Sequence, residues 1–102
     1  MDDDERRMTA AALELPIDLP IEGTLDLHTF APNEVKDVVA EYVRECRRRG
    51  IVELRIVHGK GTGVLRRQVH AVLARLPEVA SFALAAEDGG SWGATLVRLH
   101  RP

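Results

Sequence analysis

The sequence predicts an α/β protein, a two-layer sandwich in which two helices cover one face of a four-stranded sheet. Two segments carry apolar residues at helical spacing, and four others have the apolar patterns typical of strands. Glycine and proline separate them into the order strand, helix, strand, helix, strand, strand. If both right-handed crossovers move across the sheet in one direction, both helices cover the same face.

The length of 102 residues fits one domain, which we place at residues 15–102 behind a mobile acidic tail at residues 1–14. The tail holds five acidic and two basic residues, so the rest of the chain keeps 11 acidic and 12 basic ones. This near balance does not support nonspecific nucleic-acid binding through bulk charge, so any such contact needs a local basic patch.

Composition also predicts the compartment. No apolar run approaches the roughly 18 residues that suggest a membrane span, and the first residues are acidic where a secretion signal is basic. The single Cys46 falls on an apolar helical stripe and has no internal disulfide partner, so we expect a buried thiol in a reducing compartment. We therefore expect a cytoplasmic monomer without membrane contact.

The first predicted strand covers residues 24–28. Residues 15–21 before it alternate apolar and polar side chains, but their two prolines limit them to an edge or to a chain lying across the sheet. Because side chains alternate along a strand, Asp26 and His28 share one face, away from the two leucines that flank Asp26.

The first helix opens at Pro32-Asn33-Glu34, where proline and an acidic side chain suit the positive end of a helix dipole. Its apolar stripe consists of Val35, Val38, Val39, Tyr42, Val43 and Cys46. Three arginines at residues 47–49 fill the last turn before Gly50. We interpret them as a charged helix end, with contact to a phosphate backbone as the alternative.

The second half of the chain supplies the other elements. They are a buried strand at residues 51–57, a helix that begins at Thr62 or Val64 and ends at Leu76, and strands at residues 79–86 and 94–99. Pro77 stops the helix. Residues 87–93 are enough for a wide hairpin connection between the last two strands.

Two histidines, His28 and His58, each stand at the carboxyl end of a predicted strand. If these strands lie parallel, both histidines and Asp26 converge on the crevice where open α/β sheets usually bind ligands. Histidine exchanges protons near neutral pH, so the two can act as acid and base on a phosphodiester. Asp26 can orient His28 or act as the base itself.

A glycine loop follows His58 and suits phosphate binding, because its amides, a lysine and the start of the second helix can meet negative charge. The candidate phosphate-binding residues are Gly59, Lys60, Gly61, Thr62, Gly63 and Arg66. Trp92 can stack on a base, although packing on the sheet is the stronger interpretation. We interpret His70 and His100 as ordinary surface histidines. The loop lacks the Walker spacing and the dinucleotide fingerprint, which argues against an ATPase or a dehydrogenase.

Three ordered segments resemble the small MutS-related, or Smr, domain family. They are Leu25-Asp26-Leu27-His28, His58-Gly59-Lys60-Gly61-Thr62-Gly63 and Gly89-Gly90-Ser91-Trp92-Gly93-Ala94-Thr95, and the resemblance covers about residues 24–99. It implies a fold similar to the C-terminal domain of translation initiation factor three, a mixed sheet of order 1-2-4-3 with the last strand antiparallel to the others. It also implies a free-standing member of the family. Thr29 departs from the glycine that many members have there, which affects how closely a nucleic-acid backbone can approach.

The resemblance implies endonuclease activity that nicks DNA or cleaves RNA, with the family's motif residues falling on Asp26, His28, His58 and the loop glycines. The main hypothesis is therefore an endonuclease that uses Asp26, His28 and His58 for proton transfer and the loop for phosphate. The alternative is a noncatalytic nucleic-acid-binding or ribosome-binding module. No cofactor is predicted, and a metal-dependent hydrolase with the same three residues as ligands is a third hypothesis.

Overall fold

The computed structural model describes residues 21–59, 61–85 and 93–102. Its elements are β1 (Thr24–Asp26), the 3-10 turn η1 (Pro32–Glu34), α2 (Val35–Arg48), β2 (Glu53–Val57), α3 (Val64–Arg75), β3 (Val79–Leu84) and β4 (Ala94–Leu99). The predicted acidic tail, the segment at residues 15–20, Lys60 and Trp92 lie outside the described residues. Among the residues described, no helix is long and apolar enough to cross a membrane.

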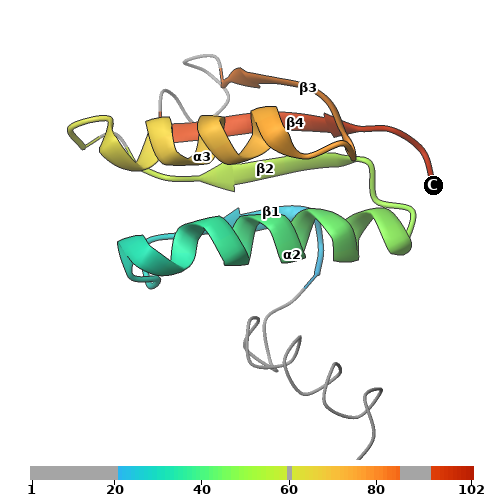
Figure 1. The fold of residues 1–102 in the computed structure, drawn as a ribbon, viewed down its shortest axis with the longest axis horizontal. Coiled ribbons are helices and arrows are strands. Elements are labelled where there is room, and N and C mark those ends of the chain that lie inside the picture. Colours follow the sequence, from blue (N-terminus) through green and yellow to red (C-terminus); the bar gives the residue numbers. More distant parts are fainter. Residues whose placement is uncertain (1–20, 60, 86–92) are drawn as a thin grey trace, which may run out of the picture.

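The four strands form one sheet in the order β1-β2-β4-β3. β1 and β2 are parallel, while β4 is antiparallel to both of its neighbours, β2 and β3. Both helices cover the same face of this sheet (Figure 1). The two-layer α/β architecture and the strand order 1-2-4-3 are therefore confirmed.

The register of the sheet places the end of β1, the end of β2 and the start of β4 side by side. Asp26 at the end of β1 pairs with Val57 at the end of β2, and Val57 pairs with Ala94 at the start of β4. Residues that follow β1 and β2 and residues that precede β4 must therefore lie at one edge of the sheet. All three motifs singled out in the sequence reach this edge.

The observed bounds differ from the predicted ones mainly at the ends of elements. The first strand stops at Asp26, although the backbone N–H of Leu27 still donates to the Val57 carbonyl at 2.9 Å. The first helix begins with a separate 3-10 turn, where the Glu34 carboxylate accepts from the Ala31 N–H at 2.8 Å and the Glu34 N–H donates to the Ala31 carbonyl at 2.9 Å. This reciprocal pair satisfies groups that a helix start leaves free.

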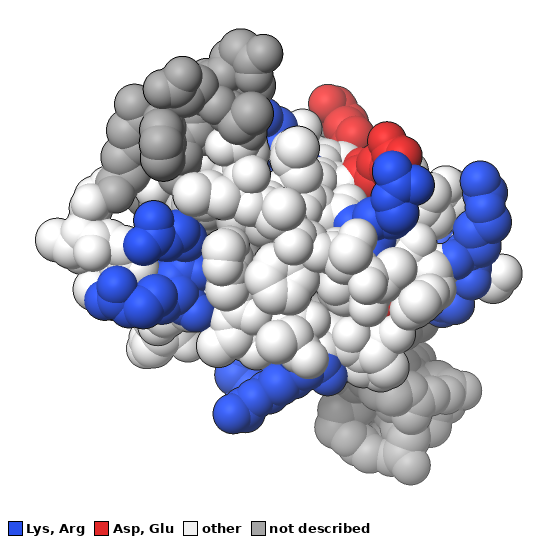
Figure 2. Space-filling model, turned by 90° about the horizontal axis from the view of Figure 1, so that it is seen from above, with Lys and Arg blue, Asp and Glu red and all other residues white. Residues whose placement is uncertain are grey.

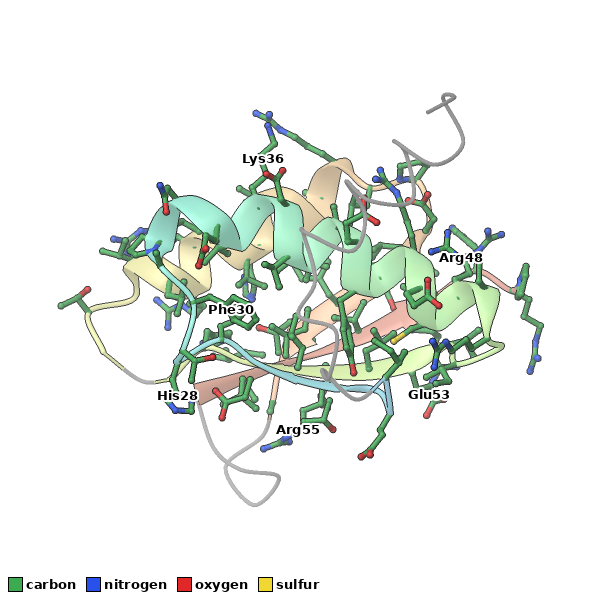
Figure 3. The ribbon with its side chains drawn as sticks, turned by 90° about the horizontal axis from the view of Figure 1, so that it is seen from below. His28, Phe30, Lys36, Arg48, Glu53 and Arg55 are labelled. Atoms are coloured by element: carbon green, nitrogen blue, oxygen red, sulfur yellow. The ribbon has the colours of Figure 1, made fainter. Side chains whose placement is uncertain are left out.

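The core lies between the helices and the sheet. The predicted stripe of α2 is buried, with Val39, Tyr42, Val43 and Cys46 fully inaccessible. Cys46 is a free thiol, and burial raises its pKa to about 11, which keeps it protonated and unreactive at neutral pH. The opposite face of the sheet carries exposed side chains, mostly polar, together with Leu96: Arg55 projects from it in Figure 3, and Glu53 and Arg98 form an ion pair at 3.4 Å.

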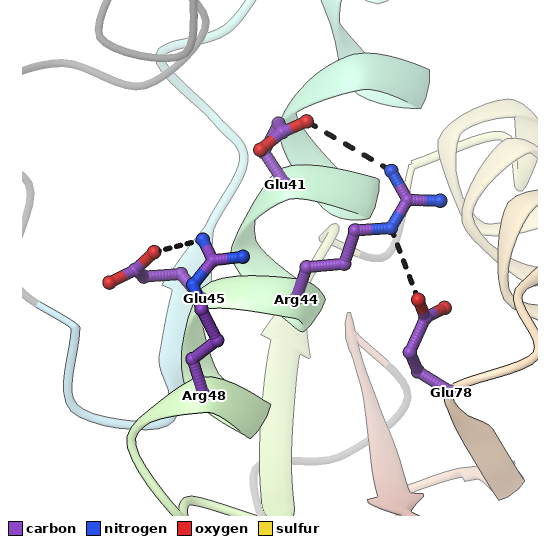
Figure 4. Close-up of polar contacts among 5 residues, drawn as sticks. All are labelled: Glu41, Arg44, Glu45, Arg48 and Glu78. Carbon is purple, nitrogen blue, oxygen red and sulfur yellow. Dashed lines mark hydrogen bonds and ion pairs between the residues drawn. The ribbon is translucent and has the colours of Figure 1, made fainter. Parts of the chain in front are cut away.

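The arginines near the end of α2 are engaged within the chain. Arg44 pairs with Glu78 at 3.3 Å and Glu41 at 3.9 Å, and Arg48 pairs with Glu45 (Figure 4). Arg47 donates to the carbonyl oxygens of His100 and Arg101, each at 2.8 Å. These contacts agree with a charged helix end and tie α2 to the segments that precede β3 and follow β4.

The Tyr42 hydroxyl joins α2 to the chain that enters β1. It accepts from the Gly23 N–H and donates to the Thr24 carbonyl, both at 3.0 Å. Gly23 is buried and has a φ of 98°, a left-handed conformation that favours glycine. The tyrosine therefore fixes the strand that carries Asp26.

Replacing Tyr42 by phenylalanine should lower the free energy of unfolding by about 1–3 kcal/mol, because two backbone groups lose their partner while the ring still fills the core. Urea denaturation followed by circular dichroism measures this. The control Ser81→Ala removes an exposed hydroxyl from β3 and should change stability by less than about 0.5 kcal/mol. Equal stability of Tyr42→Phe and the wild type would contradict the assigned role of the hydroxyl.

Candidate functional site

Asp26 and His28 form an exposed pair where β1 ends, and Figure 3 shows His28 at this end of the sheet. One carboxylate oxygen of Asp26 accepts from His28 twice, from the ring Nδ1 at 2.9 Å and from the backbone N–H at 3.0 Å. The backbone N–H of His28, followed by its ring, lowers the pKa of Asp26, so the carboxylate is ionised at neutral pH. The predicted shared face of these residues is confirmed.

The protonation of this pair sets what His28 can do. An ionised carboxylate only accepts hydrogen bonds, so the Nδ1 of His28 must carry the hydrogen. In the neutral ring the lone pair is then on Nε2, which contacts no described residue through a hydrogen bond. The His28 side chain is 75% exposed, so this nitrogen is available to a bound substrate as a proton acceptor.

His58 lies on the other side of the sheet. It continues the inward row of β2 formed by Leu54 and Ile56, and only 7% of it is exposed. Its Nδ1 lies 3.0 Å from the carbonyl oxygen of Gly59, and its Nε2 lies 2.8 Å from the hydroxyl of Thr95. Burial is the main cause that lowers the pKa of His58, so the ring is neutral near pH 7.

His58 lies in a cluster with His70 and Thr95, two residues that were not among the site residues predicted from the sequence. His70, interpreted from the sequence as an ordinary surface histidine, is half-buried in α3, and its Nε2 lies 2.8 Å from the same Thr95 hydroxyl. Its ring packs against Phe82 with 5.0 Å between centroids, and burial followed by the nearby His58 lowers its pKa. Thr95 is fully buried. The sequence did contain a signal for these contacts: Thr95 is a polar residue in the inward row of β4, and a buried polar group needs a hydrogen-bond partner.

The glycine loop is anchored by the residue that precedes β4. The Gly93 carbonyl accepts from the backbone N–H groups of His58 and Gly59, both at 2.8 Å. Gly59 has a φ of 81° and Gly63 a φ of 90°, both in the left-handed region. The third sequence motif therefore holds the second one in place.

The first turn of α3 supplies positive charge beside the loop. A Cβ atom on Gly63 would lie 3.0 Å from Arg66 and 3.1 Å from Arg67, which shows that both guanidinium groups fold over this glycine. Lys and Arg side chains gather at the end of the molecule where α3 begins (Figure 2, left). The residue before α3 is Gly63, which has no side chain to cap the helix, so the N–H groups of the first turn are left to other acceptors.

A pocket of about 340 Å³ lies between the end of β1, the glycine loop and the start of α3. Its lining comes from the end of β1, from the glycine loop and from α3, and includes Leu27, His28, Phe30, His58, Gly59, Gly61, Thr62, Gly63 and Arg66. The structure thus brings His28, His58 and the loop to one pocket. No hydrogen bond among the described residues joins His28 to His58, because they leave the sheet on opposite faces. A larger groove between α2 and α3, of about 520 Å³, contains no histidine.

The described ranges 21–59, 61–85 and 93–102 contain no group of three or more His, Cys, Asp or Glu residues placed to hold a metal ion. Asp26 and His28 point to one side and His58 to the other, and both nitrogens of His58 already have protein partners. What the geometry offers is a proton acceptor at His28 beside a loop suited to anions.

Comparisons with known proteins identify the fold and family. The sequence profile of the Smr domain matches residues 25–100. Endonuclease MutS2 of Solidesulfovibrio magneticus is 43% identical over 75 residues, which are 74% of this chain and 10% of that protein. The chain thus spans about a tenth of the length of this relative.

Two solved structures resemble the chain. The Smr domain of Thermus thermophilus MutS2 matches with a TM-score of 0.73 and 37% identity over 78% of this chain and 99% of that chain. YdaL, a stand-alone small MutS-related protein from Escherichia coli, has the same fold, with a TM-score of 0.73 and 22% identity over 91% of this chain and 76% of its own. The matched segment includes all three motifs, and the chain belongs to the Smr domain family.

Proposed function

We propose that this chain is an endonuclease that cuts phosphodiester bonds of DNA or RNA by acid–base catalysis. The observation that carries the proposal is the exposed Asp26–His28 pair on the pocket that the glycine loop lines. The MutS2 relatives are named endonucleases, which supports a nuclease-type activity. Because the chain covers a tenth of such a relative, activity of this domain itself is what the proposal adds.

His28 would start the reaction. Its Nε2 takes a proton from a ribose 2′-hydroxyl or from water, and Asp26 stabilises the imidazolium that forms. The deprotonated oxygen attacks phosphorus, the bond to the departing 5′ oxygen breaks, and that oxygen takes a proton from water or from the protonated His28. Attack by a 2′-hydroxyl leaves a 2′,3′-cyclic phosphate, whereas attack by water leaves a terminal phosphate.

The glycine loop and α3 would hold the phosphate. The N–H groups at the start of α3 and the guanidinium groups of Arg66 and Arg67 meet the negative charge that grows during attack. Thr62 is exposed on the same loop and can add a hydroxyl contact. Lys60 and Trp92 stay in the proposal as a phosphate contact and a base-stacking side chain.

His58 enters the proposal in a changed role. Both of its ring nitrogens are hydrogen-bonded within the protein, so it can exchange a proton with substrate only after one of these bonds opens. We therefore assign the first proton transfer to His28 and assign to His58 the anchoring of the loop.

Replacing His28 by alanine should lower the cleavage rate by about 10²- to 10⁴-fold, because the general base is lost. The assay incubates purified protein with labelled RNA, single-stranded DNA and duplex DNA, with and without a chelator. Asp26→Asn should lower the rate as well, because an amide no longer fixes the ring tautomer. The matched control is His100→Ala, an exposed histidine outside the pocket, which should cleave at the wild-type rate.

Equal rates for the wild type and His28→Ala would reject this site. Loss of activity with chelator would instead support a metal-dependent route. Tight oligonucleotide binding without any product would favour the noncatalytic binding module.

Replacing Gly63 by alanine should weaken oligonucleotide affinity and cost about 1–2 kcal/mol of stability, because φ is positive there and the new methyl group displaces two arginines. Gly50→Ala is the matched control, since Gly50 also has a positive φ, of 81°, a Cβ there would meet nothing within 4 Å, and the residue lies outside the pocket. Fluorescence anisotropy and urea denaturation measure the two effects. The loop assignment fails if the two variants bind equally well.

The salt dependence of binding should report Arg66. If this side chain contacts a phosphate, Arg66→Gln reduces the slope of log affinity against log salt concentration by about one. Arg49→Gln, at the far end of α2 and paired with Glu45, should leave the slope unchanged. A titration between low and physiological salt distinguishes these results, and equal slopes for both variants would remove Arg66 from the interface.

A further inference from the structure

The Thr95 hydroxyl bridges two imidazole rings. It is fully buried, and it lies 2.8 Å from the Nε2 of His58 and 2.8 Å from the Nε2 of His70. The three side chains come from different elements: His58 follows β2, His70 lies in α3 and Thr95 lies in β4. The two rings meet edge to face with 6.2 Å between their centroids.

Counting hydrogens fixes the direction of both bonds. The Nδ1 of His58 faces the Gly59 carbonyl, which can only accept, so this nitrogen carries a hydrogen and the Nε2 of the neutral ring carries a lone pair. Thr95 must therefore donate its single hydrogen to His58. Its oxygen is left to accept from His70, whose Nε2 must carry the hydrogen. The two histidines are thus held in opposite tautomers.

This chain of bonds ends on the glycine loop. The Gly59 N–H is held by Gly93 and the Gly59 carbonyl by His58, so the peptide groups on both sides of Gly59 are fixed. If the His58 ring were released, the Gly59 carbonyl would lose its hydrogen bond, and the loop could leave the sheet in a different direction. Burial lowers the pKa of both rings and keeps them neutral, as the bond directions require.

We propose that Thr95 and His70 are positioning residues of the phosphate-binding loop, which they hold by locking His58 in the tautomer that carries its hydrogen on Nδ1. The role given to the loop rests on the proposed function, whereas the tautomers do not. Neither residue touches the substrate. Their effect passes through His58 to the Gly59 carbonyl.

The tautomers can be read directly from nitrogen-15 NMR of the imidazole rings in the wild-type protein. His58 should show a protonated Nδ1 and a bare Nε2, and His70 the reverse. The same tautomer in both rings would overturn the proposal. This measurement needs no variant and no substrate, so it stands even if the protein cleaves nothing.

Variants at Thr95 test the coupling to the loop. Thr95→Val keeps the shape but removes the hydroxyl, so the His58 signals should shift toward a mixture of tautomers. Hydrogen exchange of the Gly59 amide should accelerate, and oligonucleotide affinity should fall by up to about tenfold, the effect of losing one hydrogen bond. Thr95→Ser restores the hydroxyl and should rescue all three readouts. His70→Ala should loosen the loop less, because Thr95 can still donate to His58.

The outcomes separate the two proposals. If Thr95→Val leaves the His58 tautomer and the Gly59 exchange rate as in the wild type, the positioning role is wrong. If the tautomers and exchange rates change as expected but no protein form binds nucleic acid, the positioning role stands and the proposed function fails.

Discussion

The antiparallel pairing of β4 with β2 is the constraint on which the rest of the site depends. Since Ala94 pairs with Val57, the start of β4 lies level with the end of β2. The Gly93 carbonyl therefore reaches the amides of the glycine loop, and the inward-facing Thr95 reaches the ring of His58. A parallel β4 would bring its other end, Leu99, to this edge, and neither contact could form. One strand direction thus unites segments that lie more than thirty residues apart in the chain.

The register between β1 and β2 divides the site between the two faces of the sheet. Asp26 pairs with Val57, so an even-numbered residue of β1 shares its face with an odd-numbered residue of β2. His28 is therefore directed to the open face and His58 to the core, although both follow the ends of parallel strands. On the exposed side, the Nε2 of His28 makes no hydrogen bond to any residue that the structure describes, whereas on the buried side both ring nitrogens of His58 are hydrogen-bonded.

The sequence was sufficient for the architecture but not for the site geometry. The inward stripe of α2 and the alternation around Asp26 depend only on local periodicity, and both are as predicted. The direction of His58 follows the alternation of Leu54 and Ile56, but local patterns do not show that this alternation continues past the end of the strand. The partnership of His70 with Thr95 depends on a contact between α3 and β4 across twenty-five residues of sequence. Polar residues in an inward row indicate such contacts but do not identify the partner.

The position of β4 has a consequence for synthesis of the protein. This strand is made after the other three, yet it lies between β2 and β3 and pairs with both. Until residues 94–99 leave the ribosome, β2 and β3 each lack the neighbour that fills the middle of the sheet. A chain that stops before Gly93 has both histidine motifs but neither the carbonyl nor the hydroxyl that orders the loop. A chain cut short before residue 93 therefore lacks the contacts that order the loop, and it exposes the edges of β2 and β3 that β4 covers.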